Sequence, residues 1–584
     1  MNFRTMTSVR LLGACLIAST ALAGCVSPAG DGALSRRVEL AKAEAQTRAQ
    51  ASDFSQFLIA RYASLTNDPD AAAQQYARVA KARPEDATIA ERAVFSALLA
   101  NEFSLALSIA EALDPEVATA STLPRLSLAT EAMAEGDYDA VERLTTGPEA
   151  GLFNALMLKS LEAWAVYGSG DAARAELMLM EAASGDPYLM EIVLNLLGLM
   201  EVASGQDKEA LTTFGMLSER GTIIAAGAAS YGELLASRGE TEEALAMLTR
   251  YTMEAGPNPL ISDLAARLRA GEVPDVRRPD IREGAALSIY VPAAALASQS
   301  GNDLPGVYYS MALRLDPDLH AASSMFADAL DRAGRSSEAI EILKTIPASS
   351  PYHVSATAQL AWALHRAGNN DAARTLIAQT LAGSPDRDLK IQMGDLLRSL
   401  GKDEAAVHVF DEIITGDEAK GDLDWRLYLA RGSLREALGK WPLAEEDLLL
   451  ARTLNPTSAE VLNQLGYSWI DRGVHLEQGL DMIRRALSLR PDSGAITDSL
   501  GWAYYKLGEY EQAVIHLERA AELEPGIAEI IDHLGDAYWM TGRRTEARFQ
   551  WERAITLLED EGEIRLIRRK LLTGPETMAA SRTP

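Results

Sequence analysis

The chain has 584 residues, and its 55 Lys and Arg residues against 83 Asp and Glu residues give a formal net charge of −28. An acidic chain of this size repels phosphate backbones, which excludes the usual electrostatic route to nucleic-acid binding. A hydrophobic content of 48% excludes global disorder, and a total of two cysteines excludes a disulfide scaffold and a four-cysteine zinc or iron–sulfur site.

Residues 1–24 are predicted to be a signal peptide. Arg4 and Arg10 give a positively charged start, and residues 11–23 form an apolar stretch that is too short to span a bilayer as a helix. Residues 22–25, at the end of this stretch and just beyond it, read Leu-Ala-Gly-Cys and resemble the lipobox of bacterial lipoproteins, where the cysteine is diacylglycerylated before cleavage. We therefore expect lipidation at Cys25. The alternative is an ordinary secretory signal with an incidental cysteine.

The expected lipid anchor also predicts a location. No later apolar run approaches the roughly 18 residues of a membrane-spanning helix, so the protein is expected to be anchored without crossing the membrane. Val26 follows the cysteine where an Asp would favour retention in the inner membrane of enteric bacteria, and this favours the periplasmic face of the outer membrane. Residues 25–52 are expected to form a lipid-anchored tether followed by a solvated N-terminal helix.

The C-terminal part of the chain repeats itself every 34 or 35 residues. Leu-Gly pairs end at Gly466, Gly501 and Gly535, and prolines recur with the same spacing. Each repeat also has a small residue that is followed four and seven positions later by a large apolar residue and an Ala. Followed backwards through the chain, this small position falls at Ala547, Ala513, Gly479, Ala444, Ala406, Ala373, Ala339, Pro305, Ala244, Ala210, Ala173, Ala140, Ala106 and Ala72.

The repeat pattern resembles the tetratricopeptide repeat (TPR), in which two helices joined by a tight turn form one unit. The small residues allow the two helices to approach closely, and the proline ends the second helix. The resemblance implies an all-α fold, a TPR solenoid of helix-turn-helix repeats in which each unit buries its apolar face against its neighbours. The alternative is an Ala-rich helical bundle with chance spacing, which is also all-α.

The pattern divides the expected solenoid into two arcs. Residues 53–257 form a divergent N-terminal TPR-like arc, and residues 258–282 form an extra helix and an irregular loop that breaks the array. Residues 283–560 form the C-terminal TPR arc. Residues 561–572 are expected to be a capping helix over the last apolar face, and residues 573–584 a disordered tail.

The sequence offers no residues that we assign to catalysis. Its seven histidines do not show a metal-ligand spacing, and we expect them on helix surfaces or at helix caps. Phosphate-binding and nucleophile-elbow motifs are absent from the sequence, and lipidation at Cys25 leaves no free thiol in the mature chain. We therefore expect a protein that is not an enzyme and that has no metal site and no cofactor.

Binding is the more informative prediction. In the repeat that this pattern resembles, five positions of the first helix face a concave groove, and in three consecutive units these positions hold aromatic and acidic residues. Tyr505 and Trp539 are expected to turn away from the core because their neighbours Tyr504 and Tyr538 occupy packing positions. The alternative is that the aromatic residues pack on each other or on the capping helix. The expected partner-binding residues are Asn463, Tyr467, Asp498, Trp502, Tyr505, Asp532, Asp536 and Trp539.

Residues 461–556, the lipobox and the overall length together resemble the TPR outer-membrane lipoproteins of proteobacteria. The best understood kind, in pseudomonads, docks a periplasmic carboxy-terminal processing protease and presents cell-wall hydrolases to it. The resemblance implies a lipid-anchored periplasmic scaffold or adaptor whose partners are proteins. The alternative is an activator of peptidoglycan synthesis or a component of envelope polysaccharide export, since both use lipid-anchored helical repeats.

Overall fold

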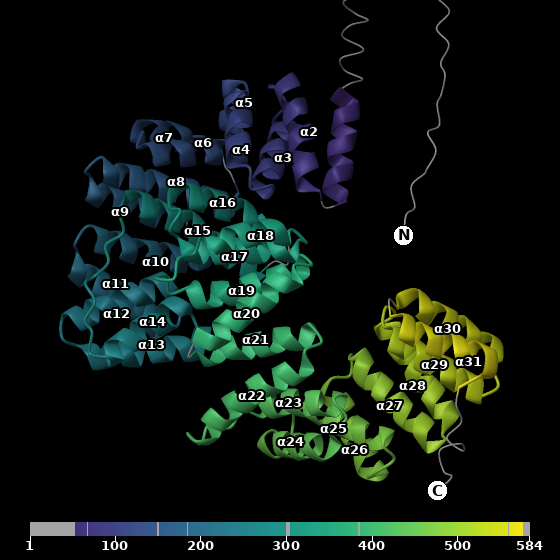
Figure 1. Cartoon of the computed structure of the whole chain (residues 1–584). Coiled ribbons are helices and arrows are strands. Elements are labelled where there is room, and N and C mark those ends of the chain that lie inside the picture. The colour runs from purple at the N-terminus through teal and green to yellow at the C-terminus, as the bar shows by residue number, and fades with distance from the viewer. Residues whose placement is uncertain are drawn as a thin grey trace, which may run out of the picture. The chain divides into compact units, whose positions relative to one another are not determined.

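The computed structural model describes residues 53–575 except residues 67, 149–150, 184, 300–303, 384–385 and 559. The expected signal peptide, the lipidation site at Cys25, the segment 25–52 and residues 576–584 of the expected tail lie outside the described residues. Within the described ranges every regular element is a helix (Figure 1). The predicted all-α class is confirmed.

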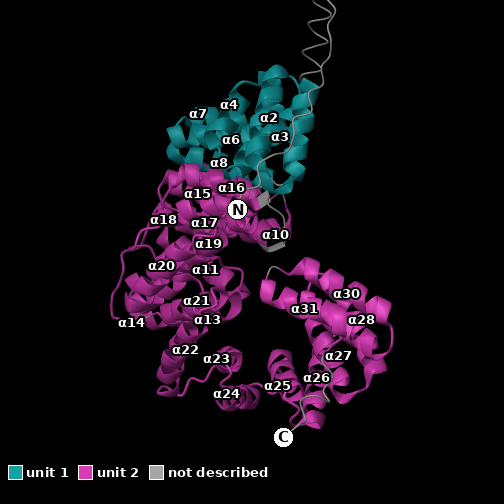
Figure 2. Ribbon diagram, turned by 45° about the vertical axis from the view of Figure 1, so that its right-hand side comes forward, with its two compact units in different colours: residues 1–171 teal, residues 172–584 magenta. Residues whose placement is uncertain are grey.

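The chain forms two compact units, residues 1–171 and residues 172–584 (Figure 2). The described part of unit 1 begins with a helix over 53–65. Its other helices are α2 (Pro69–Ala82), α3 (Ala87–Leu99), α4 (Phe103–Glu111), α5 (Pro115–Ala120), α6 (Thr122–Glu135), α7 (Tyr138–Thr145) and α8 (Leu152–Gly168).

The described part of unit 2 contains the remaining helices. They are α9 (Ala172–Glu181), α10 (Pro187–Ala203), α11 (Asp207–Arg220), α12 (Ala225–Ser237), α13 (Thr241–Ala255), α14 (Pro259–Arg269), α15 (Ile281–Gln299), α16 (Leu304–Leu315), α17 (His320–Arg332), α18 (Ser336–Lys344), α19 (His353–Arg366), α20 (Asn370–Gly383), α21 (Arg387–Ser399), α22 (Asp403–Glu418), α23 (Trp425–Ala437), α24 (Trp441–Leu454), α25 (Ala459–Asp471), α26 (Leu476–Leu489), α27 (Gly494–Leu507), α28 (Tyr510–Leu523), α29 (Ala528–Met540), α30 (Arg544–Leu557) and α31 (Glu561–Thr573).

Consecutive helices pack in pairs, and in parts of the array the first helix of one pair also contacts the first helix of the next, as α10 does with α12, α19 with α21 and α25 with α27. Local signals set the ends of these helices. The Asp86 carboxylate caps α3 by accepting hydrogen bonds from the backbone N–H groups of Thr88 and Ile89 at 3.0 and 3.1 Å. Gly508 ends α27 in the left-handed conformation that a side chain would oppose.

The fourth residue of the second helix in each pair lies at the helix crossing and is buried. Ala210, Ala406 and Ala513 occupy this position and are fully buried, as the repeat pattern predicted.

The prediction of this position is wrong in three units. The fourth residues there are Val141, Ala175 and Val307, all fully buried. The sequence pattern placed Ala140, Ala173 and Pro305 at this position instead. A search for small residues passes over the two valines, and the Ala-rich start of α9 offers two registers that only packing distinguishes.

The segment 258–282 does not separate the compact units, which divide between Asp171 and Ala172. Helix α14 buries Ile261, Leu264 and Leu268, and it packs against both α12 and α13. The backbone beyond it is non-helical up to residue 280. There the Arg278 guanidinium donates to the Val202 carbonyl oxygen at 2.6 Å and pairs with Asp207. The segment is therefore fastened to unit 2.

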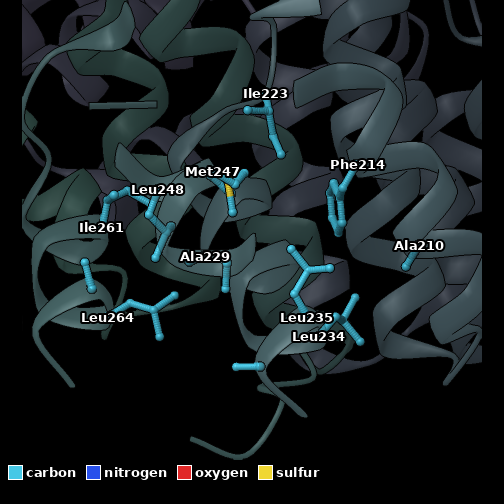
Figure 3. Packing of buried hydrophobic residues seen from close by; sticks show 14 of the residues in the cluster. Ala210, Phe214, Ile223, Ala229, Leu234, Leu235, Met247, Leu248, Ile261 and Leu264 are labelled. Atoms are coloured by element: carbon cyan, nitrogen blue, oxygen red, sulfur yellow. The ribbon is translucent and has the colours of Figure 1, made fainter. Parts of the chain in front are cut away.

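The apolar core runs along the array as successive clusters. The cluster in Figure 3 gathers residues of α11, α12, α13 and α14, with the ring of Phe214 and the side chains of Leu235, Leu248 and Leu264 among them. Because each cluster joins neighbouring helices of the array, the repeats are stabilised mainly by adjacent repeats.

Candidate binding groove

The candidate groove lies on three neighbouring first helices, α25, α27 and α29 (Figure 1). The glycine of the Leu-Gly pair in each first helix marks the side that the second helix covers. A Cβ atom on Gly501 would lie 2.6 Å from Leu517 of α28, and one on Gly535 would lie 2.5 Å from Trp551 of α30. The second helices therefore press closely against one side of the first helices.

The ring of Trp502 is stacked on the rings of Tyr505 and His533. Its centroid lies 4.7 Å from that of Tyr505 and 4.0 Å from that of His533, and the interplanar angles are 7° and 16°. Tyr505 is 7% exposed and belongs to the C-terminal apolar cluster. The expectation that Tyr505 turns away from the core is therefore wrong, because stacking on Trp502 and contact with Tyr510 hold its ring inside.

Asp498 is buried beside the imidazole of His533, and their closest N···O distance is 3.0 Å. Burial of the ring lowers its pKa, but the charge of Asp498 and the hydrogen bond outweigh burial, so the pKa of His533 is raised. The expectation that the histidines lie on helix surfaces or at caps is wrong for His533. The pair joins α27 to α29 below the ring of Trp502.

Asp532 and Asp536 share one cation, Lys570 of α31. The Lys570 ammonium lies 2.6 Å from Asp532 and 2.8 Å from Asp536. The Trp551 indole N–H also donates to Asp536 at 3.1 Å. Burial raises the pKa of Asp536, whereas the two carboxylates together raise the pKa of Lys570 against the effect of its own burial.

Gly574, directly after α31, lies against Trp539. A Cβ atom on Gly574 would lie 2.5 Å from the Trp539 indole, and the residue after it, Pro575, is also buried. The ring of Trp539 is tilted against that of Trp551, with centroids 5.5 Å apart. Trp539 thus packs on α30 and on residue 574, and the expected disorder from residue 573 is corrected for residues 573–575. The capping helix itself runs over Glu561–Thr573.

Asn463 and Tyr467 lie on α25, at the other end of the groove, and both are half-buried. Within the described part of the chain, the Asn463 side-chain oxygen and one carboxylate oxygen of Asp532 are buried without a hydrogen-bond partner. Buried polar atoms without a hydrogen-bond partner are uncommon in native proteins, so we expect a further group to bind here. Burial, together with the nearby carboxylates of Glu529 and Asp471, raises the pKa of Tyr467, so its hydroxyl is a neutral donor.

The groove therefore has two parts of different character. Around α29 the polar groups mostly satisfy each other, and α31 covers the surface. Around α25, Tyr467 and Asn463 are half-exposed, and the Asn463 oxygen has no hydrogen-bond partner in the described residues. Sequence reasoning missed His533 and Lys570, although His533 lies 35 positions after Asp498, which is one repeat length. The assignment of the eight residues to a partner site stays a prediction.

The described residues do not include a group of three or more His, Cys, Asp or Glu side chains placed to hold a metal ion. Likewise, none of the helices in the described ranges is long and apolar enough to cross a membrane.

Family models match two segments of unit 2. A tetratricopeptide-repeat model matches residues 324–388, and a second model of that repeat matches residues 498–527, which cover most of α27 and α28. Both segments are tetratricopeptide repeats. The matched TPR units lie at the centre of the candidate groove and within the α17–α21 region, and TPR units indicate a scaffold for protein–protein interaction.

A TPR repeat-containing protein of Pseudomonas aeruginosa is similar to this chain, with 34% identity over 90 residues. The match covers 15% of this chain and 15% of that protein.

Solved TPR structures are also similar. A thermophilic TPR protein of Thermus thermophilus shows 22% identity over 32% of this chain and 100% of its own, with a TM-score of 0.29. A TPR protein of Parabacteroides merdae shows 15% identity over 43% of this chain and 98% of its own, with a TM-score of 0.38.

Proposed function

We propose that this protein is a lipid-anchored scaffold on the periplasmic face of the outer membrane. It holds a protein partner in the groove of α25, α27 and α29, and it brings a processing protease to cell-wall hydrolases. Anchoring rests on the lipobox that ends at Cys25, and the kind of partner rests on the resemblance of residues 461–556 to the proteobacterial lipoproteins. Confinement to a surface and simultaneous binding raise the local concentration of two clients to roughly millimolar values.

The binding proposal rests on polar groups without hydrogen-bond partners that lie near partly exposed aromatic rings. Asn463 and Asp532 are half-buried, and each has one oxygen without a hydrogen-bond partner in the described residues, so a change of rotamer lets that oxygen accept from a backbone N–H group or a Lys side chain of a partner. The half-buried rings of Tyr467 and Trp502 supply area at a low cost in rotamer entropy. A partner segment with exposed donors and an apolar side chain fits this combination.

The anchor is tested by exchange of the cysteine. Cys25→Ala is expected to abolish labelling by radioactive palmitate and to leave residues 1–24 uncleaved, because cleavage follows lipidation of that cysteine. Cys15→Ala is the matched control, because Cys15 lies inside the expected signal peptide and is removed by cleavage. Palmitate labelling that survives Cys25→Ala would contradict the anchor.

The groove is tested by photo-crosslinking in cells with the full chain. A photo-reactive amino acid replaces Tyr467 in one strain and Ile515 of α28, which is 57% exposed, in a control strain. Mass spectrometry is expected to find a processing protease or a cell-wall hydrolase joined to position 467 and not to position 515. A peptidoglycan synthase or a polysaccharide-export protein would support the alternative function instead.

The contribution of the groove residues is measured with the captured partner in purified form. Asn463→Ala and Tyr467→Ala are each expected to weaken its binding at least about tenfold, as central contacts in interfaces do. Ile515→Ala is expected to leave the affinity unchanged. Equal affinities for all three variants would show that the partner binds elsewhere.

A further inference from the structure

Unit 2 contains a cavity of about 640 Å³ that is separate from the candidate groove. Its walls come from the first helices α10 and α12, from the start of α14, from α15, and from the loops before α17 and α19. Helices α10 and α15 contact each other although they are far apart in the sequence. The volume lies within the range of about 300–1,000 Å³ that is usual for ligand sites.

The floor of the cavity is apolar. Ile192, Ile223 and Ala229 line it and are buried, and the last two belong to the apolar cluster of Figure 3. Asn195 fixes the wall beside them. Its amide donates to the carbonyl oxygens of Glu191 and Thr222 at 2.8 and 2.9 Å, and its oxygen accepts from the Ile224 N–H at 2.9 Å.

The segment between α14 and α15 holds the rim in place. The Arg277 backbone N–H donates to the Glu233 carboxylate at 2.9 Å, and its guanidinium pairs with Glu283 at 2.8 Å. Arg278 bonds to the Val202 carbonyl oxygen and to Asp207. The cavity therefore exists before any ligand enters, which lowers the ordering cost of binding.

The charges that line the cavity are unbalanced. Five carboxylates line it with one guanidinium, that of Arg277, which is bonded to Glu283, and Glu191 is paired with Arg220 outside the lining at 3.2 Å. Two of the carboxylates, Glu233 and Asp316, accept backbone N–H groups, and neither lies within ion-pair distance of a basic side chain in the described residues. Burial raises the pKa of both groups, so a cation placed there would meet poorly solvated carboxylates.

Tyrosine rings complete the site. Tyr251, Tyr290 and Tyr352 line the cavity. Burial raises the pKa of Tyr352 to about 12, so its hydroxyl is neutral under ordinary conditions. Aromatic faces beside carboxylates attract Lys and Arg side chains through charge-assisted hydrogen bonds and cation–π contact.

We infer that this cavity binds an extended peptide segment of a partner protein, in which an apolar side chain is next to a Lys or Arg. The apolar side chain lies on the Ile192–Ile223 floor, and the cationic side chain lies between Glu233 and Asp316. A peptide fits because an apolar floor and a carboxylate-lined wall lie in one cavity, which suits the neighbouring side chains of an extended segment. The inference does not rest on the α25–α29 groove or on its proposed partner.

The test uses the purified full chain in detergent and fluorescence anisotropy of a fluorescein-labelled hexapeptide of alternating Leu and Arg. Glu233→Gln and Asp316→Asn are each expected to weaken binding about tenfold, and Ala226→Phe, which fills the cavity, is expected to abolish it. Glu242→Gln on the exposed side of α13 removes the same charge elsewhere and is expected to change nothing. Circular dichroism verifies that every variant is folded.

Two comparison ligands and one groove variant make the result decisive. A hexapeptide of alternating Leu and Glu is expected not to bind, and dodecyltrimethylammonium is expected to compete weakly. Equal loss of binding in Glu242→Gln would show that only the overall charge matters and would overturn the inference. Tight binding of dodecyltrimethylammonium would also overturn it. Tyr467→Ala in the groove is expected to leave hexapeptide binding intact, which keeps failure of this site distinct from failure of the proposed function.

Discussion

At the scale of single residues, the surroundings decide what the same side chain does. Asp498 and Asp536 both lie on first helices of adjacent repeats and both are buried. Asp498 pairs with an imidazole, whereas Asp536 accepts from an indole and from the ammonium group of a capping helix. Both were predicted as groove residues from their positions, and the contacts show them as links between helices. A buried carboxylate with a partner fixes the register of two helices, since removal of either partner leaves an uncompensated charge.

Glu201 of α10 is a buried carboxylate with little compensation. It is 7% exposed, and one of its oxygens has no hydrogen-bond partner among the residues that the structure describes. Burial raises its pKa to about 7, against the opposing effect of a hydrogen bond from Thr213. Because the folded-state pKa lies above that of the unfolded chain, the folded state holds the extra proton, and stability falls as the pH rises from about 4.5 to 7.

Glu201→Gln is expected to remove this pH dependence. The variant should be more stable than the natural chain at pH 8 by on the order of 1–3 kcal/mol, at about 1.4 kcal/mol per pKa unit, and similar to it near pH 4.5. Urea unfolding at the two pH values measures the difference, with the exposed Glu242→Gln as control. An equal shift at both pH values would show that Glu201 is charged in the folded state.

At the scale of helices, close approach of two backbones fixes a repeat. Helices α25 and α26 meet at Gly466 and Gly479, where a Cβ atom on Gly466 would lie 2.8 Å from the Gly479 carbonyl oxygen. A backbone atom cannot rotate away as a side chain can. The Leu-Gly spacing predicted this approach from the sequence alone, because the repeat places a small residue at the same point of every crossing.

Gly466→Ala is expected to destabilise the α25–α26 repeat by about 1–3 kcal/mol, because the helices must separate. This loss outweighs the gain of up to about 1 kcal/mol that Ala has over Gly inside a helix. Gly416→Ala inside α22 is the matched control, since nothing in the described residues lies within 4 Å of its added Cβ atom. Thermal unfolding followed by circular dichroism compares the two, and equal melting temperatures would contradict the close approach.

At the scale of the whole molecule, stability is distributed along the array. Apolar clusters join neighbouring helices, and the chain groups into residues 1–171 and 172–584. In such an array a local loss of packing is felt by adjacent repeats and only weakly by distant ones. Mutations in unit 1 should therefore leave the candidate groove folded.

Leu126→Ala in α6 tests this independence, since Leu126 is fully buried. The truncation is expected to cost about 2–5 kcal/mol within unit 1. Hydrogen exchange should accelerate in residues 53–171 and stay unchanged in α25–α31. Leu152→Ala is the control, because that side chain in the same unit is 52% exposed. Faster exchange in both units would mean that the array unfolds as one cooperative body.

The amino-acid sequence determined the class of the fold, the pairing of helices and most crossing positions. These features are encoded within one repeat, by the 34- to 35-residue spacing of Leu-Gly pairs, prolines and small residues. Hydrophobic spacing, helix caps and chain breakers act over a few residues, so they are legible without knowledge of the surroundings. The Leu-Ala-Gly-Cys pattern at residues 22–25, which resembles a lipobox, is local in the same way.

The tertiary structure decided which residues of the candidate groove are buried and which remain open. Stacking of Trp502 on His533, coverage of Trp539 by Gly574 and the bond from Arg278 to the Val202 carbonyl oxygen join positions that are 31 to 76 residues apart. Such contacts depend on how successive repeats rotate against one another, and small changes of packing at each crossing accumulate along the array. The cavity of unit 2 arises for the same reason, because its walls meet only when the array is assembled.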